Sequence, residues 1–249
     1  MSYEIIIMLF IAGFIAGGVN ALAGGATLLT FPVLMASGLP PTVANASNFV
    51  AVLPGNAAAI PAYQNEIGEN RKLAFTLTLA SLLGGALGCT LLLFSSDTIF
   101  LEIVPWLILT ATLLYAFGDW INGLIKSKEK GLISGTPGHL MLCLFSIYGG
   151  YFGAGLGVIT LAVLKMIGLT DFHQANAIKN LTNTAVSLLG VGIFAYGGLI
   201  AWPQAMVMMI GAGMGGYASA YYSRRISQKV LTNSVIVLGF FLSAYYFLK

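Results

Sequence analysis

One lysine and several asparagines are the residues of this sequence whose types could do chemistry inside an apolar chain. Lys179 lies well within an apolar stretch, away from every cluster of basic residues. A charge at such a depth in a membrane is costly and marks a functional site by default. It could balance an anionic substrate, although its flexible stem could also carry the ammonium group to the interface.

Asparagines occur on two stretches that are apolar enough to be helices. Their spacing places them on one face of each predicted helix. Amides at this depth should face a cavity or bond another helix, and the sequence leaves both interpretations open. The stripes are Asn45, Asn48 and Asn56 in residues 42–63, and Asn176, Asn180, Asn183 and Ser187 in residues 172–196.

Glycine-rich breaks interrupt two other apolar stretches, residues 5–38 at 23–26 and residues 138–168 at 149–157. The short helices that follow, beginning near Ala26 and Val158, should point their N-termini at one another near the bilayer midplane. Each N-terminus offers free backbone N–H groups and about half a positive charge, so the pair describes an anion site. Tight helix packing is the alternative role for any single glycine. The candidate substrate-binding residues are Gly24, Gly25, Thr27, Asn45, Asn48, Gly153, Gly155, Asn176, Lys179 and Asn180.

The remaining polar residues do not form a catalytic constellation. His173 is a candidate proton relay at a predicted helix entrance, where Asp171 fits an N-cap. The sequence shows no metal-ligand cluster and no nucleophile–base pair, and the glycines at 153–157 follow no strand, which excludes a dinucleotide site. We expect neither an enzyme nor a cofactor.

The composition requires lipid as the solvent for most of the surface. Only 8% of the 249 residues are charged, 58% are hydrophobic, and the mean hydropathy is +0.90, whereas soluble domains carry roughly 25% charged residues. A net charge of +3 does not favour nucleic acid. Cys89 and Cys143 both lie in apolar runs, which indicates packing rather than a disulfide framework.

An internal repeat organises the chain. Residues 30–39 align with 160–169, 44–46 with 175–177, and 62–63 with 195–196, at an offset of 130 to 133 residues. Each half contains one broken segment followed by three stretches near the ~20 residues that a membrane span needs. These stretches are 42–63, 73–94, 99–122, 172–196, 203–222 and 230–248.

The positions of the basic residues predict how the two halves are oriented in the membrane. They cluster at 71–72, at 126–130 and at 224–229, and basic loops face the cytoplasm. All three clusters do so if each broken segment returns to the side from which it enters, which leaves both termini outside. We therefore predict an all-α polytopic membrane protein with two inverted repeats, 1–125 and 138–249, joined by a basic cytoplasmic linker at 126–137.

The glycine run at 13–18, the Gly24-Gly25 break and the following Phe31-Pro32 resemble the TauE/SafE family of membrane proteins, also called sulfite exporters. Residues 149–157, Gly168-Leu169 and the run from 175 to 180 are similar to that family's second repeat. The resemblance covers nearly the whole chain. It implies a bacterial or archaeal inner-membrane permease, in a family with members linked to sulfite, thiosulfate or organosulfonate anions.

The sequence thus predicts a multi-pass secondary transporter of a prokaryotic inner membrane. It should move a small anion by alternating access around a midplane site, with lipid and the anion as partners and no nucleic acid. Oligomerisation is left open. The alternative is a membrane scaffold or assembly partner whose glycines and asparagines only pack helices.

Overall fold

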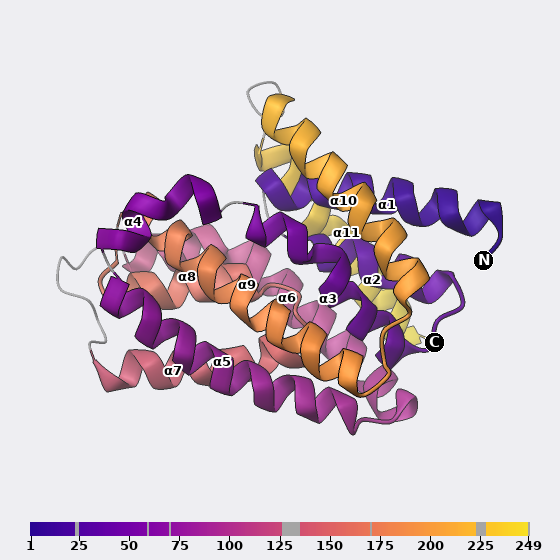
Figure 1. The fold of residues 1–249 in the computed structure, drawn as a ribbon, viewed down its shortest axis with the longest axis horizontal. Helices are drawn as coiled ribbons and strands as arrows, with labels where there is room; N and C mark the ends of the chain where they lie inside the picture. Colours follow the sequence, from indigo (N-terminus) through magenta and orange to yellow (C-terminus); the bar gives the residue numbers. More distant parts are fainter. Residues whose placement is uncertain are drawn as a thin grey trace.

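The computed structural model describes residues 1–22, 25–58, 60–69, 71–125, 135–169, 171–222 and 228–248. Regular structure in these ranges is entirely helical, which confirms the predicted all-α class (Figure 1). The basic cluster at 126–130 and positions 224–225 of the cluster at 224–229 lie outside the described residues.

The first half follows the predicted order, with one difference in its third helix. Its elements are α1 (Tyr3–Leu22), α2 (Ala26–Ala36), α3 (Pro41–Ala57), the 3₁₀ helix η1 (Ile60–Tyr63), α4 (Gln64–Glu69), α5 (Arg71–Leu93) and α6 (Asp97–Ile125). The second half contains α7 (Thr136–Tyr151), α8 (Leu156–Met166), α9 (Phe172–Tyr196), α10 (Trp202–Tyr222) and α11 (Gln228–Leu248).

The prediction of one continuous helix over residues 42–63 is wrong. Helix α3 ends at Ala57, and η1 and α4 follow it. Two prolines explain the early end: Pro54 lacks the N–H that the last turn needs, and Pro61 disfavours helical geometry at Ile60. Residues 64–69, which connect the predicted spans 42–63 and 73–94, are also helical, as α4.

Long apolar helices give the molecule a surface suited to lipid. In the described part of the chain, stretches of α1, α5 and α6 are long and apolar enough to cross a membrane. Along α5, every fourth side chain from Phe75 to Leu91 is a large apolar group that is 49% exposed or more. A continuous apolar ridge of this kind is unfavourable in water and matches the predicted lipid environment.

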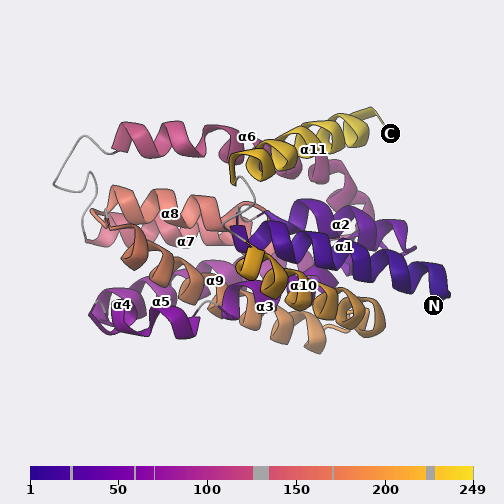
Figure 2. The same cartoon turned by 90° about the horizontal axis from the view of Figure 1, so that it is seen from above.

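Both glycine breaks are built in the same way. Gly25 and Gly155 adopt left-handed backbone angles, with φ of 88° and 76°, which glycine tolerates because it has no Cβ. Each glycine begins a helix of 11 residues, α2 or α8. Figure 2 shows that α2 and α8 leave the middle of the molecule in opposite directions, each packed on the helix that precedes it.

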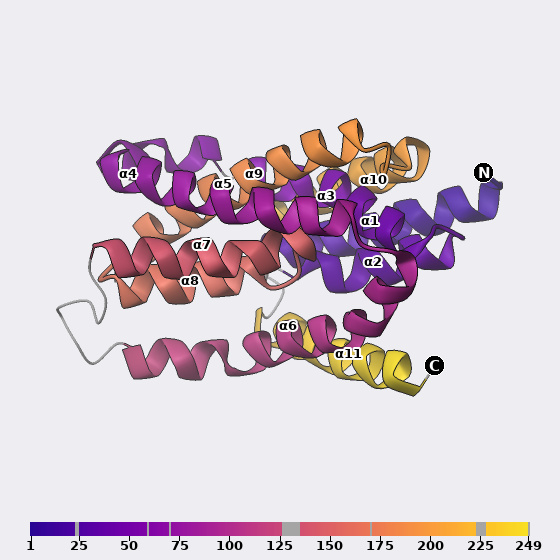
Figure 3. The same cartoon turned by 90° about the horizontal axis from the view of Figure 1, so that it is seen from below.

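Helices of one half pack reciprocally on helices of the other. Helix α1 packs on α10 as α7 packs on α5, and α3 packs on α9. Helices α6 and α11 pair on one side of the molecule (Figure 3). The start of α1 and the end of α11 lie at one end, and α4 lies at the other (Figures 1 and 3).

Small residues allow these helices to approach closely. A Cβ at Gly17 would lie 2.0 Å from the carbonyl oxygen of Ala212, and one at Gly215 would lie 1.8 Å from that of Phe14. On α5, a Cβ at Gly84 would lie 1.9 Å from the carbonyl oxygen of Cys143. These glycines therefore serve helix packing, as small residues commonly do in membranes.

Candidate functional site

A cavity of about 840 Å³ lies where the two glycine breaks meet. Its walls come from the end of α1, the starts of α2 and α8, the second half of α3, the first half of α9 and part of α10. Among the described residues, its lining contains no carboxylate. The polar side chains of the wall are Asn20, Thr27, Asn48, Asn56, Tyr63, Asn176, Lys179, Asn180, Asn183, Ser187 and Tyr217.

The N-termini of α2 and α8 both open into this cavity, through residues 25–27 and 155–158. Neither helix has a side-chain cap. The N–H groups of Leu28 and Val158 reach the carbonyls of Gly25 and Gly155 at 3.1 and 3.0 Å. The N–H groups before them have no acceptor within their own helix, so two helix N-termini offer donors and partial positive charge to one space.

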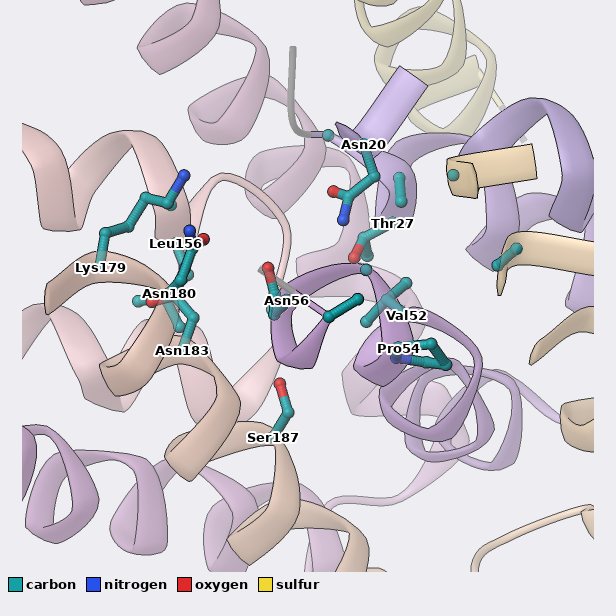
Figure 4. Close-up of a pocket in the computed structure, with 18 of the residues that line it drawn as sticks. Asn20, Thr27, Val52, Pro54, Asn56, Leu156, Lys179, Asn180, Asn183 and Ser187 are labelled. Atoms are coloured by element: carbon teal, nitrogen blue, oxygen red, sulfur yellow. The ribbon is translucent and has the colours of Figure 1, made fainter. Parts of the chain in front are cut away.

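Lys179 supplies a full positive charge to the same space. Its side chain is half-buried, and its Nζ donates a hydrogen bond to Oδ1 of Asn176 at 2.9 Å. Figure 4 shows Lys179, Asn180 and Asn183 on one wall, with Asn20 and Thr27 across from them. Since no carboxylate belongs to the described lining, the ammonium group has no counter-charge in the cavity.

The asparagines divide between the two roles that the sequence left open. Asn48 bonds both threonines of α2: it accepts from Thr30 and donates from Nδ2 to Thr27 Oγ1 at 3.1 Å. In the second half, Asn183 Oδ1 accepts from Thr160 of α8 at 3.2 Å. These bonds join each short helix to the span that follows it.

Asn180 is different because its amide forms no hydrogen bond within the described part of the chain. The residue is 8% exposed and faces the cavity. Its amide is therefore free to bind a ligand next to Lys179.

Two of the predicted site residues that the structure describes, Asn45 and His173, are not in the cavity lining. Asn45 is fully buried and donates from Nδ2 to the carbonyl of Tyr151 at 2.8 Å, which caps the end of α7. His173 is exposed, and its ring lies 6.4 Å from that of Tyr63 at the cavity wall. Gly24 lies outside the described residues. The predicted N-cap is confirmed, since Asp171 Oδ1 accepts from the backbone N–H of Gln174 at 2.8 Å.

Sequence reasoning missed Asn20, Tyr63 and Tyr217 as lining residues. Asn20 carried a signal, because it is a polar residue in the last turn before the first break. The two tyrosines carried none: Tyr63 comes from the segment predicted as the end of a span, and Tyr217 lies near the end of α10.

Phe152, in the second glycine break, belongs to a cluster of packed aromatic rings. Phe31 meets Phe152 edge-to-face at 5.5 Å and Phe100 at 6.0 Å, and all three side chains are almost fully buried. Phe49, which lines the cavity, packs on Phe194 at 5.2 Å. Such rings fill space densely and leave no room for water or solute between them.

The fold and the cavity define the class: an all-helical, multi-pass membrane protein with two interrupted helices around a polar, cationic space. The family model for the sulfite exporter TauE/SafE matches residues 9–246. The chain therefore belongs to this family, as its residues suggested.

Curated relatives match over almost their whole length. A "probable membrane transporter protein" of Haemophilus influenzae is 28% identical over 98% of this chain and 95% of its own. "Probable membrane transporter protein YfcA" of Escherichia coli K12 is 26% identical over 95% of this chain and 87% of its own. A third, from a Sinorhizobium species, is 23% identical over 96% of this chain and 91% of its own. No solved structure matches.

Proposed function

We propose that this protein is a secondary transporter that binds a small anion in the 840 Å³ cavity. The observation that carries this proposal is the charge of the cavity. Two uncapped helix N-termini and the Lys179 ammonium group face one space whose described lining holds no carboxylate. Helix N-termini bind anions through free N–H groups and the helix dipole.

The bound anion would lie between the two breaks. Backbone N–H groups near Gly25 and Gly155 would donate to its oxygens, with the free amide of Asn180 as a further donor and Lys179 as counter-ion. Thr27, Asn48, Gly153 and Asn176 line the same space and complete the proposed site. An oxyanion suits this arrangement because its several acceptor atoms can take donors from both walls. Sulfite, thiosulfate or an organosulfonate fits these requirements, and the family's description as sulfite exporters supports a sulfur oxyanion.

Transport would proceed by alternating access of two inverted repeats, 1–125 and 138–249, joined at 126–137. The reciprocal packing of α1 on α10 and of α7 on α5 supports this, as do the matching breaks. The aromatic rings around Phe152 would form the closed gate on one side of the site. The relatives' names as probable membrane transporters support transport as the activity.

A membrane scaffold is the second candidate, favoured by the bonds from Thr30 to Asn48 and from Thr160 to Asn183, which tie helices together. A scaffold needs no free amide and no uncompensated lysine in a cavity. Asn180 and Lys179 therefore favour transport.

A thermal-shift screen of the purified protein against sulfite, thiosulfate, an organosulfonate and chloride tests the proposal. A ligand that binds only the folded state stabilises it by about 2.7 kcal/mol at a hundredfold excess over its Kd. We expect at least one sulfur oxyanion to raise the unfolding temperature in a saturable manner, beyond the effect of chloride at equal ionic strength. If none does so, the proposed site is wrong.

A further inference from the structure

A groove separate from the cavity lies on the surface of the helix bundle, where α4, α5 and α9 meet. Its volume is about 690 Å³. Its floor is apolar: Ala74 is buried, and Ile67 and Leu181 pack against the same cluster of core side chains. The exposed side chains of Arg71 and Lys72 stand at one end of it. A surface groove that is apolar along its length and cationic at one end matches an amphiphile with an anionic head.

The position of the groove along the bilayer normal follows from the apolar ridge of α5. Large exposed side chains recur at every fourth position after Arg71; they are Phe75, Leu79, Leu83, Leu87 and Leu91. From Arg71 to Leu91 the helix rises about 30 Å, which is the thickness of the hydrocarbon core. Arg71 and Lys72 therefore lie at the level of the lipid headgroups, and Phe75 lies just inside the hydrocarbon.

No ion pair within the described part of the chain balances the charges of Arg71 and Lys72. Neither side chain forms an ion pair or hydrogen bond within the described residues. Both occupy the first turn of α5, where the helix dipole is also positive and cations are unfavourable. Glu69 of the neighbouring α4 accepts instead from Gln174 Nε2, at 3.5 Å. An anion at this end of the groove would reduce the repulsion between the two cations and their repulsion by the helix dipole.

We propose that this groove binds one anionic phospholipid of the surrounding leaflet. Its phosphate lies against Arg71 and Lys72, and one acyl chain lies over Ala74, Phe75 and Leu181. A zwitterionic lipid fits less well because its own cation would meet the same two charges. The lipid would contact both α5 and α9, the helix that carries Lys179 and Asn180 on its cavity side. This inference stands whether or not the cavity carries an anion.

Native mass spectrometry of the full chain, delipidated in a neutral detergent, tests the proposal. Phosphatidylglycerol and phosphatidylcholine with identical acyl chains are titrated separately. We expect one tightly retained phosphatidylglycerol and weaker binding of phosphatidylcholine. Each basic residue near the membrane surface strengthens the binding of an anionic headgroup. The double variant Arg71→Gln/Lys72→Gln should therefore lose at least about tenfold in phosphatidylglycerol affinity.

Matched variants separate this site from general effects of charge and surface. The charge-conserving Arg71→Lys/Lys72→Arg variant should keep the lipid, and Lys165→Gln, outside the groove, should leave binding unchanged. Phe75→Ala should weaken binding, whereas Leu87→Ala, on the same ridge but outside the groove, should not. Equal uptake of the two lipids, or a phosphatidylglycerol preference that survives the double Gln variant, overturns the proposal. So does a dimer that Phe75→Ala dissociates, since a second copy of the chain would then occupy the groove.

Discussion

At the scale of single residues, the cavity depends on the contrast between bonded and free polar groups. Asn48 and Asn183 are held by threonines of the short helices. Among the described residues, Asn180 has no protein partner, and Lys179 bonds only the neutral amide of Asn176. The bonded residues fix the walls, and the free donors are available to a ligand.

Replacing Lys179 with methionine keeps the apolar stem and removes the charge. We expect anion binding to weaken by about 1.5–3 kcal/mol, the range for hydrogen bonds to charged groups. The free energy of unfolding should change little, because losing an uncompensated charge relieves its desolvation. Isothermal titration of the purified variant measures the first quantity, and thermal unfolding measures the second. Lys165→Met, which removes a lysine outside the cavity, is the matched control. Equal affinities of wild type and Lys179→Met would remove Lys179 from the site.

Much of the cavity lining could be predicted from the sequence because polar residues stand out in apolar stretches. Gly25, Thr27, Asn48, Gly153, Gly155, Asn176, Lys179 and Asn180 all line it. Asn45 does not, although it precedes Asn48 by three residues on the same face. It caps the end of α7, and helix contacts between the two halves cannot be deduced from spacing within one helix.

At the scale of elements, glycines do two different jobs that the sequence alone does not separate. Gly25 and Gly155 provide left-handed turns at the starts of α2 and α8. Gly17 and Gly215 provide close contact between α1 and α10. Both kinds belong to glycine-rich runs in the sequence. The sequence alone does not show that α1 packs on α10, a helix of the other half. Pro54 and Pro61 indicated that the backbone could open in this span, but the sequence did not predict that α3 ends at Ala57.

The packing role predicts different effects on stability for two glycine-to-alanine changes. In Gly17→Ala the new Cβ would lie 2.0 Å from a backbone oxygen of α10, so the helices must separate. We expect a loss of about 1–3 kcal/mol in unfolding free energy, as for other overpacked sites. Gly192→Ala, in α9, meets nothing within 4 Å and should be neutral or stabilising by up to about 1 kcal/mol. Unfolding followed by circular dichroism in detergent compares them; equal effects would refute the packing role of Gly17.

At the scale of the whole molecule, the proposed inverted repeats fix the side on which each loop lies. Single cysteines at positions 128 and 226, in a background with Cys89 and Cys143 replaced by alanine, should react with an impermeant maleimide only from the cytoplasmic side. Cysteines at positions 2 and 249 should react only from the outside. The reason is that each broken segment returns to the side from which it enters. Labelling of 128 and 226 from opposite sides would contradict the inverted arrangement.

The most direct test of anion transport through the cavity is flux into proteoliposomes. The anion that stabilises the protein most is supplied in radiolabelled form, and uptake is compared between wild type, Lys179→Met and protein-free liposomes. We predict saturable uptake by wild type and at least about tenfold less by Lys179→Met at subsaturating substrate, as expected for a loss of 1.4 kcal/mol or more. Uptake by wild type no faster than in protein-free liposomes, or undiminished uptake by Lys179→Met, would contradict the account.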